Sequence, residues 1–224
     1  MIKKEIYPKT KRVSCSGDKV YITEKLDGSN LVFFKKNDEL YIAQRKTIIN
    51  INELKEVKDK LYKGLYQWLL DNKDYLQEQL INDSAICGEW LGMGKLKYDV
   101  SEFGKRWYMF AKANIDDEYN LYNLIYDHEL FKYPFLNQEI PKFIGIVPEV
   151  TELNVLPTKE YLDSVYEKYT SKVKRDVEGF VINYKNIISK YVRMKNGKLE
   201  EHFDRGEEWI YWKPKMKLIN CKIH

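Results

Sequence analysis

Residues 19 to 46 alternate β-branched or aromatic side chains with polar ones, and Gly, Asn and Asp interrupt the alternation twice. The segments KVYITEK, LVFFKK and ELYIAQRK are separated by turns at DGSN and KND. Such alternation is typical of strands whose two faces meet different environments. Strands joined by turns this short run antiparallel to their neighbours. We therefore predict an antiparallel meander here, which restricts the chain to folds that contain an antiparallel sheet.

The spacing of apolar residues changes after residue 50. Ile51, Leu54, Leu61 and Leu65 recur at helical spacing beside a charged face, which predicts an amphipathic helix over residues 51–82, broken near Gly64 or Asn72. The other predicted elements are strands over 85–91 and 107–113, a helix over 120–133, a strand over 142–147, a helix capped by Thr158, and strands over 177–184 and 190–195.

No repeat, low-complexity tract or linker rich in Pro and Gly divides the chain, and 224 residues suffice for one substantial core. We predict a single domain over residues 1–224 of the α+β class, in which helices flank antiparallel sheets. No apolar run approaches the roughly 20 residues of a membrane span, and no signal peptide is recognisable. The expected protein is cytoplasmic and has no membrane partner.

Cysteine, histidine and net charge narrow the class of partner. Cys15, Cys87 and Cys221 form no CxxC pair and the three histidines have no ligand spacing, so neither a zinc site nor a disulfide framework is expected. A net charge of +4 means that any nucleic-acid surface is local. The basic and aromatic segment Trp209–Lys217 is one candidate, with an exposed basic strand as the alternative.

Three groups of residues are candidates for a functional site. Lys25 ends an apolar strand directly before a turn; a free lysine has a pKa of about 10.4, so it attacks only when it is desolvated or surrounded by positive charge. Tyr191, Arg193 and Lys195 share one face of a strand, so both cations can face one phosphate. Glu89 and Glu178 lie in or beside buried strands, where carboxylates need partners. An exposed hairpin lysine, a solvated basic strand and structural salt bridges are the alternatives.

These residues belong to five short motifs that follow one another along nearly the whole chain. Together the motifs resemble those of the covalent nucleotidyltransferase superfamily of ATP-dependent ligases and RNA capping enzymes. Ser29, Asn30, Arg45 and Val147–Glu149 look most similar to the RNA ligase 2 group. The motifs are Lys25–Asn30, Gly88–Trp90, Tyr108–Phe110, Glu178–Ile182 and Arg193–Asn196.

The resemblance implies an ATP-grasp-like ligase adenylation domain and an ATP-dependent RNA ligase. Lys25 would accept AMP from ATP, pass it to a 5′-phosphate and so allow a 3′-hydroxyl to seal the RNA. Glu178 would bind Mg²⁺ or Mn²⁺, and Arg193 and Lys195 would assist catalysis. The residues expected to contact the nucleotide are Glu24, Lys25, Asn30, Arg45, Glu89, Phe110, Glu178, Arg193 and Lys195.

Two departures from the family pattern keep other readings open. Ala111 and Lys112 follow Phe110 where an acidic residue is common, and Arg193 stands where a lysine is expected, although Lys213–Lys217 offers a second fifth motif. A DNA nick ligase, a capping-type guanylyltransferase and a domain that only binds nucleotide remain alternatives. The chain ends soon after Lys195, so we expect no separate C-terminal oligonucleotide-binding domain. An accessory RNA-binding protein and a viral or phage origin are compatible with it.

Overall fold

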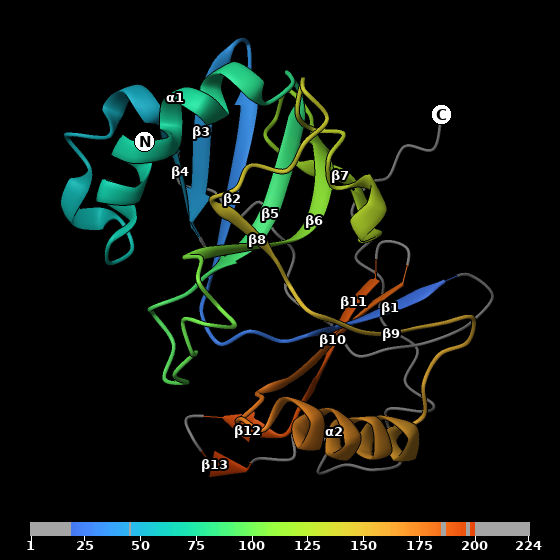
Figure 1. The fold of residues 1–224 in the computed structure, drawn as a ribbon. Coiled ribbons are helices and arrows are strands. Elements are labelled where there is room, and N and C mark those ends of the chain that lie inside the picture. Colours follow the sequence, from blue (N-terminus) through green and yellow to red (C-terminus); the bar gives the residue numbers. More distant parts are fainter. Residues whose placement is uncertain (1–18, 45, 185–186, 196–197, 200–224) are drawn as a thin grey trace. The chain divides into compact units, whose positions relative to one another are not determined.

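The computed structural model describes residues 19–44, 46–184, 187–195 and 198–199, which form two compact units (Figure 1). The described part of unit 1 comprises residues 28–44 and 46–146, and that of unit 2 comprises residues 19–27, 147–184, 187–195 and 198–199. Each unit has its own sheet and its own hydrophobic core. The predicted α+β class with antiparallel sheets is confirmed. Unit 1 is therefore an insertion between β1 of unit 2 and the remainder of that unit.

Unit 1 is built on an antiparallel sheet with strand order β4-β3-β2-β5-β6-β7, which β8 extends as a parallel neighbour of β6. Asn37 and Asp38 both have positive φ, at 50° and 60°, as a two-residue hairpin between β2 and β3 requires. The strands are β2 (Ser29–Lys36), β3 (Glu39–Gln44), β4 (Thr47–Asn50), β5 (Ser84–Trp90), β6 (Trp107–Ile115), β7 (Leu121–Ile125) and β8 (Ile144–Ile146).

The predicted meander is correct for β2 and β3 but wrong for the strand before them, and β4, which follows β3 in the sheet, was not predicted. Residues 20–24 form β1 (Val20–Glu24), which pairs with two strands of unit 2 instead of with β2. The DGSN segment is accordingly the connection between the units and not a hairpin turn. Local alternation identifies a strand, but its partners lie more than 120 residues away in the chain.

Helix α1 (Leu65–Gln79) covers one face of the unit 1 sheet (Figure 1). Before it, residues 51–63 form only two short 3₁₀ turns, η1 (Ile51–Glu53) and η2 (Lys58–Lys60). The predicted helix over 51–82 is thus confirmed in its second half alone, and it starts directly after Gly64, where a break was expected. The earlier apolar residues still reach the core, because Ile51, Leu54 and Val57 are buried in it.

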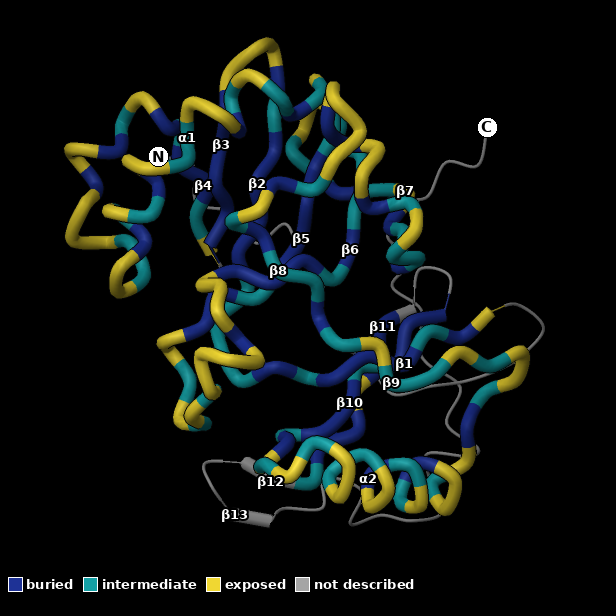
Figure 2. Tube along the Cα trace, in the orientation of Figure 1, coloured by how far each residue is buried: buried dark blue, intermediate teal, exposed yellow. Residues whose placement is uncertain are grey.

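Aromatic packing joins α1 to the sheet. Phe33 of β2 is fully buried, stacks on Trp68 of α1 at a centroid distance of 5.4 Å and meets the edge of Trp107 at 5.0 Å. The indole nitrogen of Trp107 donates to the carbonyl of Leu31 at 3.0 Å, which satisfies the one polar group of that side chain. Figure 2 shows the central strands β2, β5 and β6 as mostly buried.

The predicted helix over residues 120–133 is wrong. This segment forms β7 and a short 3₁₀ turn, η3 (His128–Leu130). The reason is a tight turn before it, in which Asp116 accepts hydrogen bonds from the backbone of Asn120 at 2.7 Å and from its side chain at 2.9 Å. Tyr119 adopts a positive φ of 60° in the same turn. The chain therefore reverses direction and β7 pairs with β6.

Unit 2 contains a four-stranded antiparallel sheet with strand order β11-β10-β1-β9. Helix α2 (Lys159–Val173) packs on one face, where Leu162 and Tyr166 contact the core residues Ile22, Phe180 and Tyr191. The predicted cap is confirmed, because the hydroxyl of Thr158 accepts from the backbone N–H of Tyr161. The other strands are β9 (Glu149–Leu153), β10 (Gly179–Tyr184), β11 (Ile187–Val192), β12 (Met194–Lys195) and β13 (Lys198–Leu199).

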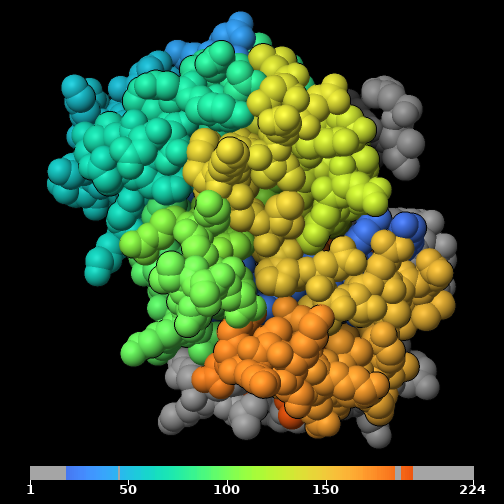
Figure 3. Space-filling model, viewed as in Figure 1, coloured from blue at the N-terminus to red at the C-terminus, as the bar shows by residue number. Residues whose placement is uncertain are grey.

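The outer side of α2 is exposed, as Figures 2 and 3 both show. Helices α1 and α2 each have 15 residues, and both contain acidic and basic residues. Within the described ranges, no helix has the length and apolar character that crossing a membrane requires.

Because Phe33 links α1 to the sheet, we expect Phe33→Ala to destabilise unit 1 by about 3–5 kcal/mol, the usual cost of removing a buried phenylalanine. Urea unfolding followed by tryptophan fluorescence would measure the loss, since Trp68 and Trp107 both touch Phe33. Leu70→Ala, at an exposed position of α1, is the control and should change stability by less than about 0.5 kcal/mol. Similar losses in both variants would contradict this account of the core.

Candidate active site

Lys25 directly follows β1, an interior strand of the unit 2 sheet. The backbone N–H of Glu24 donates to the carbonyl of Pro148 at 2.9 Å, and the N–H of Lys25 donates to the carbonyl of Gly179 at 2.9 Å. The chain at Lys25 is therefore fixed from both sides, by the segment before β9 and by the first residue of β10. These bonds give the predicted segment Val147–Glu149 a structural role beside Lys25.

The amine of Lys25 donates a hydrogen bond of 2.7 Å to a carboxylate oxygen of Glu178. Both side chains are mostly buried, with 23% of Lys25 and 14% of Glu178 exposed. Burial raises the pKa of Glu178, and the nearby charge of Lys25 opposes this only in part. The site thus joins an amine to a carboxylate that accepts a proton more readily than an ordinary glutamate.

Gly179 allows the chain after Glu178 to come close to β11. Its φ is +154°, and a Cβ atom there would lie 1.9 Å from the carbonyl oxygen of Tyr191. A side chain at this position would separate the two strands, because a Cβ cannot approach a backbone oxygen so closely. Gly179 therefore keeps β10 and β11 close together beside Glu178.

Arg193 lies between β11 and β12, and its side chain contacts α2. Its Nη1 atom is 2.9 Å from a carboxylate oxygen of Asp163 and 3.2 Å from the hydroxyl of Tyr191. Its guanidinium lies over the ring of Tyr166 at 5.3 Å. Tyr191 and Arg193 therefore share a face, as predicted. The backbone N–H of Arg193 also donates to the carbonyl of Glu178 at 2.9 Å.

Asp163 is the centre of this contact. It also accepts hydrogen bonds from Tyr191 and, at 2.9 Å, from Lys159. Burial would raise the pKa of Asp163, but the hydrogen bonds from Tyr191 and Lys159 and the charge of Arg193 outweigh it and hold the pKa below its usual value. Asp163 therefore stays ionised and fixes Arg193. For Lys195 the structure describes the backbone in β12, and its side chain lies outside the described residues.

In unit 1, Asn30 of β2 stands opposite Glu89 of β5, and Glu89 stands opposite Tyr108 of β6. Residues directly opposite one another share a face of the sheet. Leu31 and Phe33, which alternate with Asn30, face α1. Asn30, Glu89 and Tyr108 therefore form a row across three strands on the other face. The structure thus brings together two residues that were predicted separately, Asn30 and Glu89.

Gly28 brings the start of unit 1 close to this row. A Cβ atom at Gly28 would lie 2.4 Å from the carbonyl oxygen of Trp90 and 2.9 Å from Cγ of Glu89. Only a residue without a side chain allows the turn to pass here. The close approach places Gly28, the first described residue of unit 1, directly against the end of β5, beside Glu89.

Phe110 does not continue the regular alternation of its strand. Cys87 pairs with Ala111 and Gly88 pairs with Met109, so Phe110 occupies a β-bulge. The predicted strand over 107–113 contained no such irregularity. In the structure Tyr108 is buried, packs against Phe103 and against Gly145 of β8, and its hydroxyl accepts from the backbone N–H of Lys105. Phe110 is partly exposed.

Glu178, which is hydrogen-bonded to Lys25, is the candidate carboxylate for binding a metal ion. Within the described ranges, no three His, Cys, Asp or Glu residues gather into a metal site. A single carboxylate still fits Mg²⁺ or Mn²⁺ bound with a nucleotide, since Mg²⁺ usually keeps several waters and takes other ligands from phosphate oxygens. Arg45, Trp209–Lys217 and the second fifth motif lie outside the described residues.

Glu24 was expected to contact the nucleotide, but its carboxylate contacts Arg175 and Tyr169 in unit 2. Sequence reasoning did not identify either of these partners. Arg175 lies in the run Lys-Val-Lys-Arg-Asp, where nothing distinguishes it from a solvated basic residue. A buried partner for Glu24 could be inferred only from the predicted burial of β1.

The family model described as RNA ligase matches residues 18–196 of the chain. A comparison with curated proteins found no match. Among solved structures, the chain is similar to a mutant of Naegleria gruberi RNA ligase with ATP and Mn, with a TM-score of 0.47 and 20% sequence identity; the match covers 79% of this chain and 49% of that chain. It is also similar to a second mutant of that ligase with AMP and Mn, with a TM-score of 0.48 and 18% identity over 84% of this chain and 59% of that chain. A third similar structure is that of a putative ATP-dependent DNA ligase from Aquifex aeolicus, with a TM-score of 0.46 and 16% identity over 84% of this chain and 49% of that chain. The chain spans about half the length of these ligases.

The raised pKa of Glu178 predicts a pH-dependent effect on stability. The folded protein retains a proton on Glu178 at pH values where the unfolded chain has released it, so this contribution is present at low pH and lost as pH rises through the folded-state pKa. Glu178→Gln is neutral throughout. We expect the difference in melting temperature between Glu178→Gln and the parent to shift by about 2 °C in favour of the variant when the pH is raised from 4 to 7.5. In a chain of this size, such a shift corresponds to a change of about 1 kcal/mol or less in the free energy of unfolding.

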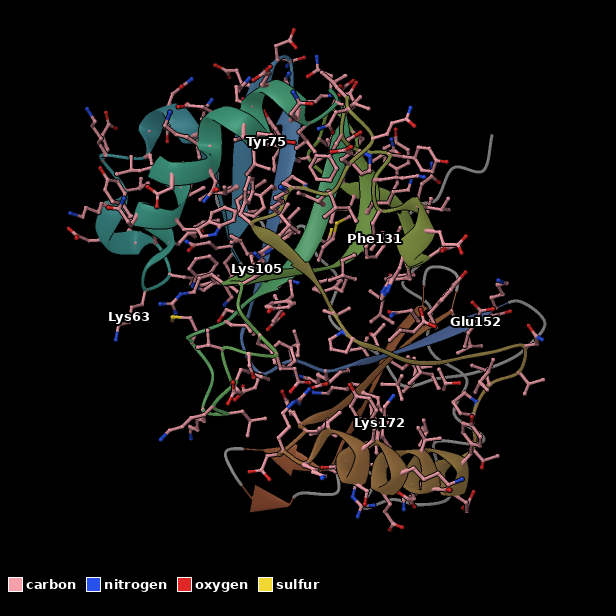
Figure 4. All side chains as sticks on the ribbon, in the orientation of Figure 1. Lys63, Tyr75, Lys105, Phe131, Glu152 and Lys172 are labelled. Carbon is pink, nitrogen blue, oxygen red and sulfur yellow. The ribbon has the colours of Figure 1, made fainter. Side chains whose placement is uncertain are left out.

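Thermal unfolding at the two pH values, followed by circular dichroism, would measure this difference. The matched control is Glu152→Gln, which removes a carboxylate that pairs with Lys19 at the surface; Figure 4 labels Glu152 on β9. The control should show no gain at the higher pH. If the melting temperature of Glu178→Gln instead fell relative to that of the parent between pH 4 and pH 7.5, the pKa of Glu178 would not be raised.

Proposed function

Because the chain belongs to the RNA ligase family, we propose that it is an ATP-dependent RNA ligase whose nucleophile is Lys25. The observation that carries the proposal is the placement of Lys25. Its backbone is fixed by two strands, its side chain is mostly buried, and its amine lies 2.7 Å from the carboxylate of Glu178. A lysine held in this way has both a defined direction and a proton acceptor.

In the first step, the amine nitrogen of Lys25 would attack the α-phosphorus of ATP. A nitrogen–phosphorus bond forms, the bond from that phosphorus to the bridging oxygen breaks, and pyrophosphate leaves. The amine must lose a proton, because an ammonium group has no electron pair to donate. Glu178 already accepts a hydrogen bond from this amine, so it is the proposed first acceptor of the proton. Lysyl-AMP is the expected product.

In the next steps, AMP would pass from Lys25 to a 5′-phosphate of RNA, and the 3′-hydroxyl of another end would then displace it. A divalent cation, when bound, would neutralise charge on the phosphates. Glu178 is the proposed carboxylate ligand for Mg²⁺ or Mn²⁺. Arg193 and Lys195 would contribute positive charge that favours departure of pyrophosphate. Arg193 would act from its fixed place beside Asp163.

Residues of unit 1 would bind the nucleotide. Glu89 and Asn30 stand next to each other in one row of the sheet, which suits a carboxylate and an amide that share a polar ligand. We assign Glu89 to the ribose hydroxyls and Asn30 to a phosphate, together with Arg45. Phe110 is proposed to stack on adenine. Its place in a bulge and its partial exposure support this role better than the packed ring of Tyr108 does.

Transfer of label from ATP tests the nucleophile. We expect the protein, incubated with Mg²⁺ and ATP labelled at the α-phosphate, to retain label after denaturing electrophoresis, and Lys25→Ala to retain none because the attacking amine is gone. Lys19→Ala removes an exposed lysine that precedes the same strand and should be labelled like the parent. Absence of label in the parent, or label that persists in Lys25→Ala, would refute the proposal.

The nucleotide and the ends that are joined distinguish the alternatives. We expect the labelled protein to seal RNA strands with 3′-hydroxyl and 5′-phosphate ends, and to accept label from ATP but not from GTP. Denaturing gels of end-labelled RNA and of nicked duplex DNA, incubated side by side, would compare the rates. Faster sealing of the DNA nick would indicate a DNA ligase, and label from GTP would indicate a guanylyltransferase.

A further inference from the structure

The side chain of Glu24 is fully buried, although it carries a carboxylate and directly precedes Lys25. A buried carboxylate is costly unless hydrogen bonds and an opposite charge compensate it. Arg175 supplies both: its Nη1 lies 2.5 Å from Oε1 and its Nη2 lies 2.7 Å from Oε2 of Glu24. The hydroxyl of Tyr169 donates to Oε2 at 2.7 Å. Both oxygens of Glu24 are thus held by groups of unit 2.

The geometry of this contact restricts rotation of Glu24. Two parallel hydrogen bonds between a planar guanidinium and a carboxylate define an orientation as well as a distance. Arg175 is itself only 12% exposed and lies just after α2, while Tyr169 belongs to the last turns of that helix. Glu24 is therefore anchored to α2 from two directions.

The anchor lies next to Lys25 but points away from it. Successive side chains of a strand point to opposite faces. Glu24 stands opposite Phe180, a core residue on the side of α2, whereas Lys25 reaches Glu178. Their backbone N–H groups are hydrogen-bonded to two different neighbours. Any twist of the chain at the end of β1 would swing the amine of Lys25, and the contact between Glu24 and Arg175 resists that twist.

We propose that Glu24, Arg175 and Tyr169 form a positioning cluster that fixes the end of β1 and so aims Lys25 at the α-phosphate of ATP. This inference rests on the proposed ligase function, and it gives Glu24 a role in positioning instead of direct nucleotide contact. Displacement of a reacting group by about 1 Å costs roughly 100-fold in rate. Loosening the cluster should therefore slow lysyl-AMP formation without weakening ATP binding.

The test uses Arg175→Met, Glu24→Gln and the double variant in the full chain. For each we would measure the rate of lysyl-AMP formation at saturating ATP, and the ATP dissociation constant by calorimetry in a Lys25→Ala background. Arg175→Met should form lysyl-AMP about 10–100-fold more slowly while the dissociation constant stays within about threefold. Arg175→Lys, which keeps the charge but not the paired hydrogen bonds, should fall between parent and Arg175→Met.

The double variant separates positioning from mere stabilisation. Arg175→Met leaves a buried charge without its partner, so its melting temperature should fall. Adding Glu24→Gln removes that charge and should restore the melting temperature. The rate of lysyl-AMP formation should nevertheless remain low, because the two parallel hydrogen bonds between Arg175 and Glu24 are still absent. If Arg175→Met fails to fold, the double variant alone decides the question through its rate.

Lys172→Met is the matched control, since it removes an exposed positive charge from the last turn of α2; Figure 4 labels this residue. It should behave like the parent. A parental rate in Arg175→Met, a loss expressed only in ATP affinity, or a rate that recovers with the melting temperature in the double variant would overturn the inference. A parent chain that takes no label from ATP would instead refute the ligase function, and this inference with it.

Discussion

The pairing of β1 with two distant strands is the constraint on which the rest of the structure depends. β1 lies between β10 and β9, and its last residues are hydrogen-bonded to Gly179 and Pro148. This pairing joins the two sequence segments of unit 2, and it brings Lys25 to Glu178 across 153 residues of chain. An interior strand that pairs with a neighbour on each side has little freedom to slide. The direction of the lysine therefore follows from the sheet.

Sequence patterns predicted the features that depend on neighbouring residues. The hairpin at Asn37 and Asp38 and the cap at Thr158 are local, and both are found where they were expected. The partners of β1, the bulge at Phe110 and the contact of Arg175 with Glu24 depend on residues far away in the chain. Periodicity contains no information about them. The wrong helix over residues 120–133 is a different failure, because the turn at Asp116 was overlooked.

The carboxylates of Glu24 and Glu178, both near Lys25, differ in how far the fold compensates their burial. Glu24 is fully buried but compensated by a bidentate arginine, so it serves structure. Glu178 is less buried, and the amine of Lys25 and the charge of Lys190 compensate its burial only in part, which leaves its pKa raised. Such incomplete compensation costs stability and is common at sites that do chemistry. The motifs identified Glu178 and Lys25, and packing explains why their neighbour Glu24 differs.

The insertion of unit 1 between β1 and its partners also affects how the protein is made. At about 5–20 residues per second, a ribosome needs roughly 8–30 s to extend the chain from Lys25 to Glu178. When synthesis reaches residue 146, the described part of unit 1 is complete, whereas both partner strands of β1 are still to be made. Closing so large a loop is slow compared with forming a hairpin. A nascent chain would thus complete its reactive centre late, after the larger unit has folded.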